Sequence, residues 1–186
     1  YISRYDDTTD SKKVNLYPKH KLRGKGWNIL KMIDFAIKHN VKYLAFVDSD
    51  LMSIKPNWVY KLIKPIKINE ADFVIPLYKR NRYEGSTTNH FCVPVLKHYL
   101  KLETPIRQPI GGEFAFNLKF AKKIGKAKKH PNVYKYGVDI FLTFLALRYG
   151  CRIKQVTLGQ KKHKPSFGKM IPMFEQVCCT LLWLIN

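Results

Sequence analysis

Two carboxylates placed two residues apart are the most informative chemical feature of the sequence. Asp48 and Asp50 directly follow the apolar run 43–47, and the carboxyl ends of strands in an open α/β sheet face the ligand crevice. Unpaired carboxylates there repel each other and resist desolvation, and a hard cation such as Mg²⁺ or Mn²⁺ relieves both effects. The pattern favours a metal site, but an acidic turn in which Asp50 caps a helix explains the same residues.

A lysine flanked by glycines lies upstream of these carboxylates. Gly24, Lys25 and Gly26 come just before a predicted helix. Glycines let the backbone approach a phosphate, a helix N-terminus favours negative charge, and the lysine adds a point charge. The GxxxxGK[ST] spacing of a Walker loop is absent. The segment therefore predicts either a phosphate contact or a simple turn at the start of a helix.

Three later segments carry candidate groups that also have plainer explanations. Glu113 follows Gly111 and Gly112, where the backbone can approach a ligand, or where a glycine turn precedes a surface carboxylate. Asp139 begins a strongly apolar helix, a position that capping also explains. His163 lies among lysines, so it is either a solvated side chain or a neutral imidazole that ligates a metal.

An alternation of helices and strands must position these residues. The residue pattern predicts helices over 27–39, 56–64 (ended by Pro65), 95–102, 116–124 and from 168 onward, and a buried helix that is apolar nearly all round over 138–149. Apolar runs predict strands over 43–47, 72–75 (ended by Pro76) and 153–158 (ended by Gly159), and residues 79–90 are predicted to form a loop. The alternation indicates an α/β fold with a mostly parallel central sheet.

Composition limits the class of protein. The chain has 186 residues, 46% of them hydrophobic, which suits one globular domain rather than a disordered basic tail. The longest nearly apolar run, residues 177–185, is far shorter than the roughly 20 residues of a membrane span. The four cysteines lack a metal-binding spacing and are interpreted as reduced thiols, which predicts a cytoplasmic protein.

The charge is strongly basic. Lys and Arg number 34 against 13 Asp and Glu, a net charge of +21. Such a charge favours an anionic partner: nucleic acid, a membrane face or a phosphorylated small molecule. The basic residues are spread along the chain, so most are expected to form a solvated surface.

Taken in order, the segments with candidate chemistry resemble one family. The chain is similar to GT-A fold glycosyltransferases, and within them to the retaining group that includes glucosyl-3-phosphoglycerate synthase and its mannosyl relatives. The resemblance runs from about residue 23 to 182, and the segments that carry it are 24–26, 48–50, 108–115, 136–140 and 159–163. It implies a GT-A sandwich that transfers sugar from a nucleoside diphosphate sugar.

The resemblance also implies roles for individual residues. Asp50 and His163 would ligate Mg²⁺ or Mn²⁺, which offsets the charge that grows on the departing nucleoside diphosphate. The implied catalytic residues at the sugar and acceptor are Glu113 and Asp139, without an obligatory covalent nucleophile. The implied substrate-binding residues are Gly24, Lys25, Asp48, Gly85, Thr88, Gly112 and Tyr136.

The acceptor loop departs from the family pattern. The phosphoglycerate-using enzymes have Gly-Arg-x-Thr, whereas this chain has Gly85 and Thr88 with Ser86 at the arginine position. The family's asparagine two residues after the metal-binding histidine is Pro165 here. Loss of the guanidinium removes a bidentate phosphate contact. These departures argue against phosphoglycerate, unless Arg80, Arg82 or a nearby lysine replaces the lost charge. A small molecule or a lipid phosphate is the expected acceptor.

The resemblance predicts that the N-terminal nucleotide-binding edge of the sheet is missing. In a single domain over 1–186, residues 1–22 would be a remnant of the nucleotide-binding half, 23–75 the metal-site half and 76–186 the acceptor half. The expected chain is thus a fragment of a GT-A enzyme.

Two other functions stay open on sequence grounds. A sugar nucleotidyltransferase would share the sheet and the acidic metal site. A basic nucleic-acid-binding module would use the charge, although no RNP-like aromatic signature, helix-turn-helix or zinc finger is present. A peripheral membrane contact, through the basic surface and the apolar last helix, and a homodimer also remain open.

Overall fold

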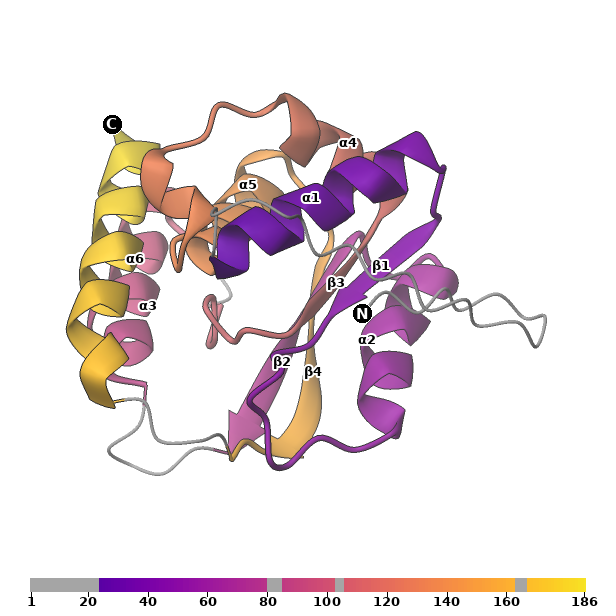
Figure 1. The fold of residues 1–186 in the computed structure, drawn as a ribbon, viewed down its shortest axis with the longest axis horizontal. Helices are drawn as coiled ribbons and strands as arrows, with labels where there is room; N and C mark the ends of the chain where they lie inside the picture. The colour runs from indigo at the N-terminus through magenta and orange to yellow at the C-terminus, as the bar shows by residue number, and fades with distance from the viewer. Residues whose placement is uncertain (1–23, 80–84, 103–105, 163–166) are drawn as a thin grey trace.

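Four strands and six α-helices form the described part of the chain, which comprises residues 24–79, 85–102, 106–162 and 167–186 of a computed structural model (Figure 1). The strands are β1 (Tyr43–Phe46), β2 (Phe73–Lys79), β3 (Phe114–Asn117) and β4 (Ile153–Gln160). The α-helices are α1 (Lys25–Lys38), α2 (Asn57–Lys67), α3 (Val93–Leu100), α4 (Leu118–Lys126), α5 (Val138–Arg148) and α6 (Met170–Ile185). Short turns of helix cover Thr87–Cys92 (η1, π-type), Pro131–Tyr134 (η2) and Phe167–Lys169 (η3).

The sheet is mixed, with strand order β1-β3-β2-β4. β3 pairs antiparallel with β1 and with β2, whereas β2 and β4 pair parallel. Three strands therefore run in the same direction, as the sequence predicts, and β3 runs against them. The carboxyl ends of β1, β2 and β4 consequently lie at the same edge of the sheet as the start of β3.

The helix predicted over 116–124 begins later than expected, and an unpredicted strand precedes it. Residues Phe114–Asn117 form β3, and α4 begins only at Leu118, with the Asn117 side chain accepting from Phe120 N at 2.9 Å. A four-residue strand is too short to show a clear period in the sequence. Its identity depends on its neighbours, because Phe116 pairs with Leu44 on one side and with Phe73 on the other.

Neither proline ends its element as predicted. Pro65 lies in the last turn of α2, which runs on to Lys67. A proline so near the end costs little helical hydrogen bonding, and buried Leu62 and Ile66 hold this turn to the sheet. Pro76 lies inside β2, beyond the last residue paired with β3, where β4 is the only paired neighbour described.

Helices cover both faces of the sheet, and two further helices, α3 and α6, lie to one side of this layered core (Figure 1). α1, α4 and α5 pack on one face around Ile33, Phe116 and Phe141, all of them fully buried. α2 covers the other face through Trp58 and Leu62. α3 and α6 pack against the far side of α5. This layered arrangement confirms the predicted α/β sandwich.

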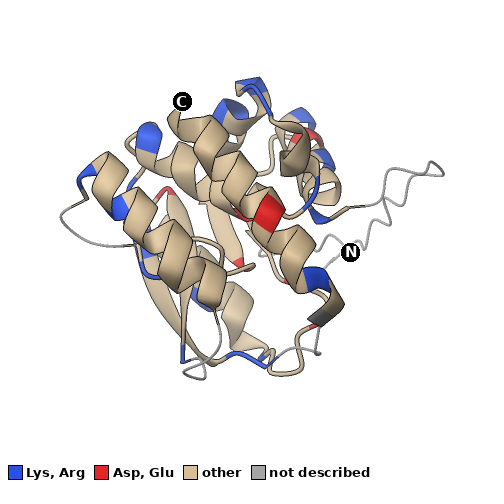
Figure 2. Ribbon diagram, turned by 90° about the vertical axis from the view of Figure 1, so that its left-hand side faces the viewer, with Lys and Arg blue, Asp and Glu red and all other residues tan. Residues whose placement is uncertain are grey.

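The surface is basic over several elements rather than in a single patch. Lys and Arg colour the ends of several helices and loops in Figure 2, and few acidic residues accompany them. α6 carries a single charged residue, Glu175, and exposes Ile171, Phe174 and Leu182. Among the described residues, no helix combines the length and the apolarity that crossing a membrane requires.

Candidate functional site

Charged side chains from five elements meet at the carboxyl edge of the sheet. Asp48 follows β1, Lys161 follows β4, and Glu113 directly precedes the antiparallel β3. Lys25 is the first residue of α1, and Asp139 lies in the first turn of α5. The sheet thus brings together residues separated by more than a hundred positions in the sequence.

Lys25 links two of the predicted carboxylates. Its Nζ lies 2.8 Å from Asp48 Oδ1 and 2.9 Å from Asp139 Oδ2. The other oxygen of Asp139, Oδ1, is buried and has no hydrogen-bond partner among the described residues. Asp139 therefore keeps one buried acceptor atom that the described residues do not satisfy.

A second cation, Lys161, joins the third carboxylate, Glu113, to Asp48. Its Nζ lies 3.0 Å from Glu113 Oε2, 3.6 Å from Asp48 Oδ2 and 2.7 Å from the carbonyl oxygen of Gly111. Tyr78, near the end of β2, donates its hydroxyl to Glu113 Oε2 at 2.5 Å. Glu113 is fully buried.

The charges of this cluster are unequal, with three carboxyl groups facing two ammonium groups. Burial raises the pKa of Glu113 and of Asp139, and the adjacent Asp48 carboxylate adds to both shifts while the lysines oppose them. Burial also disfavours the charged form of Lys25, but the carboxylates of Asp139 and Asp48 outweigh it and raise its pKa. The cluster therefore contains one carboxyl group more than it has ammonium groups to pair with.

Glycines allow the backbone to close around these groups. Gly112 has φ +94°, and a Cβ atom there would lie 2.2 Å from Asp48 Oδ2. A Cβ on Gly26 would lie 1.9 Å from the carbonyl oxygen of Val133, and one on Gly24 would lie 2.6 Å from that of Tyr134. The glycines around Lys25 thus let α1 pack closely on η2. This packing agrees better with the predicted turn at the start of a helix than with the alternative of a phosphate contact.

The remaining predicted residues are placed outside the charged cluster. Asp50 is exposed beyond β1. Tyr136 is partly buried, and its backbone N–H donates to Gln176 Oε1 at 3.0 Å. Gly85 has φ +80° at the start of η1, in which Thr88 is buried. His163 and Pro165 lie outside the described residues.

Asp50 suits a divalent cation better than Asp48 does. Both oxygens of Asp48 face lysines, whereas Asp50 is exposed and has no ion pair with a described residue. The described residues contain no group of three or more His, Cys, Asp or Glu side chains arranged to hold a metal. Mg²⁺ commonly binds through one or two carboxylates, with water and phosphate oxygens completing the shell. A single exposed carboxylate such as Asp50 is therefore sufficient as the described protein ligand.

Sequence reasoning missed two members of the cluster. Lys161 was grouped with the surface lysines, although its side chain is only 9% exposed. Its position directly after a strand, like that of Asp48, was the available signal. Nothing local marks Tyr78, because its contact with Glu113 spans 35 residues.

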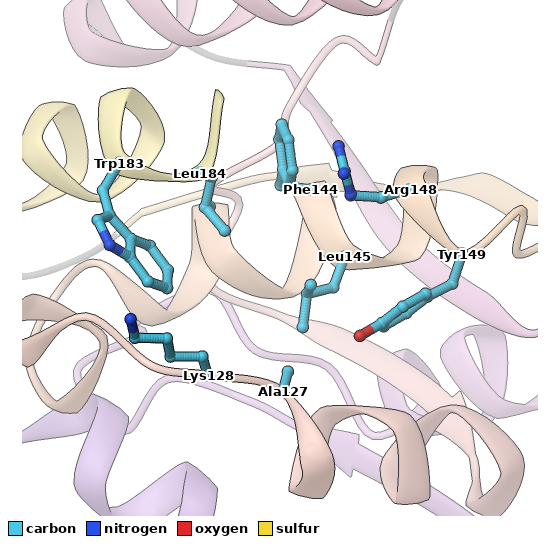
Figure 3. A pocket seen from close by; sticks show the side chains of 8 residues that line it. All are labelled: Ala127, Lys128, Phe144, Leu145, Arg148, Tyr149, Trp183 and Leu184. Carbon is cyan, nitrogen blue, oxygen red and sulfur yellow. The ribbon is translucent and has the colours of Figure 1, made fainter. Parts of the chain in front are cut away.

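A surface pocket lies elsewhere, between the C-terminal ends of α5 and α6 (Figure 3). Its volume is about 220 Å³, and none of the candidate site residues lines it. Its lining includes two cations, Lys128 and Arg148, and the aromatic rings of Phe144, Tyr149 and Trp183. The charged cluster at the sheet edge remains the candidate for chemistry.

Comparison with known proteins identifies the family. The family described as "Mannosylglycerate synthase, GT domain" matches residues 11–177. A mannosylglycerate synthase from Selaginella moellendorffii is 24% identical over 145 residues, which are 75% of this chain and 33% of that protein.

Solved structures agree in fold. Glucosyl-3-phosphoglycerate synthase from Mycobacterium tuberculosis, in complex with Mn²⁺, UDP and phosphoglyceric acid, is 26% identical with a TM-score of 0.74, covering 91% of this chain and 57% of that one. The same enzyme with Mn²⁺, UDP-glucose and glycerol 3-phosphate gives 26% identity and a TM-score of 0.69, covering 90% and 57%.

The chain spans a third of the curated relative and a little over half of these solved chains. The GT-A resemblance is thereby confirmed at the level of fold. With the family match extending over most of its residues, the chain belongs to the mannosylglycerate synthase GT-domain family.

Proposed function

We propose that this chain carries the catalytic site of a metal-dependent glycosyltransferase that moves a sugar from a nucleoside diphosphate sugar to a small anionic acceptor. The observation that carries the proposal is the meeting of Asp48, Asp139 and Lys25 at the carboxyl edge of the sheet, where α/β folds bind ligands. Family membership supports a sugar transferase over a nucleotidyltransferase or a nucleic-acid-binding module.

The metal is proposed to be Mn²⁺ or Mg²⁺, held by Asp50 and, on the resemblance, by His163. The solved relatives contain Mn²⁺ together with UDP or UDP-glucose. Such a cation supplies Lewis-acid stabilisation of the departing diphosphate. Exposure of Asp50 beyond β1 leaves its carboxylate accessible for this role.

The chain's own side chains orient the sugar. Carboxylate oxygens accept hydrogen bonds from sugar or ribose hydroxyls, and Asp48 and Asp139 are clamped in place by Lys25. We assign Asp139 a catalytic role at the acceptor, on the ground that its buried Oδ1 has no hydrogen-bond partner among the described residues. Lys25 keeps a positive charge beside the diphosphate end of the donor.

An anionic acceptor is consistent with the relatives and with the charge of this chain. Solved relatives hold phosphoglyceric acid or glycerol 3-phosphate, and this chain has a net charge of +21. Ser86 lacks the guanidinium of the phosphoglycerate-using pattern. We therefore propose a small anionic acceptor other than phosphoglycerate, with Gly85 and Thr88 in its binding segment. Cytoplasmic location, membrane contact and homodimer formation stay predictions.

The metal assignment predicts the behaviour of Asp50→Ala. Isothermal calorimetry with Mn²⁺ and UDP should show binding by the unmodified chain and at least a tenfold weaker affinity in the variant, because a ligand of the cation is lost. Glu70→Ala is the matched control, since Glu70 is an exposed carboxylate at the opposite end of β2 that pairs with Lys154. Equal affinity in Asp50→Ala and Glu70→Ala would remove Asp50 from the metal site.

A further inference from the structure

Both carboxylate oxygens of Glu113 are engaged by other side chains of the protein. None of the residue is exposed, Tyr78 donates to Oε2 at 2.5 Å, and the Lys161 ammonium lies 3.1 Å from Oε1 and 3.0 Å from Oε2. A group that exchanges a proton with a substrate must come within hydrogen-bonding distance of it. Asp139 retains a buried oxygen without a partner among the described residues, whereas Glu113 does not.

Lys161 has contacts that extend well beyond Glu113. Its ammonium donates to the Gly111 carbonyl at 2.7 Å, lies 3.6 Å from Asp48 Oδ2 and sits over the ring of Tyr78 at 5.3 Å. A single buried cation thus connects the segment after β1, the turn before β3, β2 and the segment after β4. The Gly111–Gly112 backbone and one side of Asp48 are fixed by the same group.

We infer that Glu113 and Tyr78 are positioning residues that hold the Lys161 ammonium against Asp48 and the Gly111 carbonyl. The inference rests on the proposed function for its consequence, which is that Asp48 presents a fixed orientation to the donor. Lys25 holds one oxygen of Asp48 and Lys161 faces the other. Glu113 acts on the donor only through Lys161.

Tyr78 completes this support from β2, the strand between β3 and β4. Its hydroxyl is directed at Glu113, and its backbone carbonyl accepts from Gln108 Nε2 at 3.0 Å. Gln108 belongs to the turn that leads to Gly111. Tyr78 therefore ties both the carboxylate and the turn to β2, so loss of its hydroxyl should loosen Lys161 without removing a charge.

A double-mutant cycle distinguishes positioning from catalysis. Glu113→Gln, Lys161→Met and the double variant are compared by calorimetric affinity for Mn²⁺ and UDP and by sugar transfer from UDP-glucose to glycerol 3-phosphate. If Glu113 acts through Lys161, each single variant binds at least tenfold more weakly, and the double variant is no worse than Lys161→Met. A further tenfold loss of turnover on adding Glu113→Gln to Lys161→Met would overturn the inference and make Glu113 catalytic.

A ligand-free measurement separates failure of this inference from failure of the proposed function. In ¹⁵N-lysine-labelled protein, the buried Lys161 ammonium should give a slowly exchanging cross-peak, assigned by its absence in Lys161→Met. The peak should shift or broaden in Glu113→Gln and in the milder Tyr78→Phe. It should stay unchanged in Glu70→Gln, the control for the exposed pair with Lys154. A peak unaffected by both Glu113→Gln and Tyr78→Phe would overturn the inference, whatever the protein binds.

Discussion

At the scale of single residues, the candidate site is a compact arrangement of opposite charges with one carboxyl group in excess. Burial makes the excess charge costly, which is why it raises the pKa of both Glu113 and Asp139. A cationic ligand group or a hydrogen-bond donor at the site relieves that cost.

Gly112 gives a direct test of how closely this arrangement is packed. Gly112→Ala places a methyl group 2.2 Å from Asp48 Oδ2 at a backbone φ of +94°. We expect a loss of about 1–2 kcal/mol of stability from the backbone conformation alone, a further loss from the clash, and at least tenfold weaker binding of Mn²⁺ and UDP. Urea unfolding and calorimetry measure both effects.

Gly159→Ala is the matched control for backbone strain. Gly159 has φ +92°, and a Cβ atom there meets nothing within 4 Å. This variant should show the strain without the clash. If the two variants lose the same stability and bind nucleotide equally, Asp48 is not confined by the glycine turn.

At the scale of elements, the first turn of α1 positions Lys25. The backbone N–H of Gly26 donates to the carbonyl of Lys135 at 3.0 Å, and η2 lies directly against this turn. Lys25 reaches Asp48 and Asp139 only because α1 approaches the η2 backbone so closely. The close packing of the first turn of α1 on η2 thus decides where the Lys25 ammonium lies.

We predict that Gly26→Ala separates α1 from η2. Its methyl group would lie 1.9 Å from the Val133 carbonyl oxygen, and overpacking of this kind typically costs about 1–3 kcal/mol. Urea unfolding should register the loss. Gly125→Ala in α4 is the control, because the nearest atom to its methyl group is the flexible end of Ile37 at 3.1 Å and alanine favours a helix. Equal stability of Gly26→Ala and Gly125→Ala would contradict the proposed close packing.

At the scale of the whole molecule, Asp72 ties the edge of the sheet opposite the candidate site. Arg152 Nε lies 3.1 Å from Asp72 Oδ2, and Asn117 donates to Asp72 Oδ1 at 2.9 Å. One carboxylate therefore joins the beginnings of β2 and β4 to the end of β3. Hydrogen bonds from Arg152 lower the pKa of Asp72 from 3.8 to about 2, with burial opposing.

This shift predicts an acid-sensitive contribution to stability. Because the pKa is lower in the folded chain, the contribution of Asp72 is fully present above its unfolded value near pH 4 and is lost as the pH falls towards 2. The difference in unfolding free energy between the unmodified chain and Asp72→Asn should be constant from pH 5 to 8 and shrink below pH 4. Urea unfolding at constant salt measures it, with Glu70→Gln as the control for removing a surface charge. A difference independent of pH between 5 and 2 would contradict the assignment.

Much of this fold could be predicted from local pattern. The helical spacing of apolar residues in α1, the long apolar stretch of α5 and the short apolar run of β1 are signals that can be read without knowing the packing partners. The antiparallel β3 and the persistence of α2 and β2 through Pro65 and Pro76 were missed. These features depend on neighbours that are remote in sequence, because pairing and burial outweigh the local preference of a short segment.

The sequence by itself determined the residue types of the candidate site and the strand ends that carry them, since Asp48 follows an apolar run and Asp139 begins an apolar helix. Tertiary structure alone decided which charges face one another. Lys161 and Glu113 are 48 residues apart and Lys25 and Asp139 are 114 apart. The Lys161–Glu113 pair forms because β3 runs against its neighbours, which brings its start to the same edge as the ends of the other strands. The Lys25–Asp139 pair forms because the first turns of α1 and α5 meet at that edge. Which charges interact depends on their distance in space, and the number of residues between them in the sequence does not give that distance.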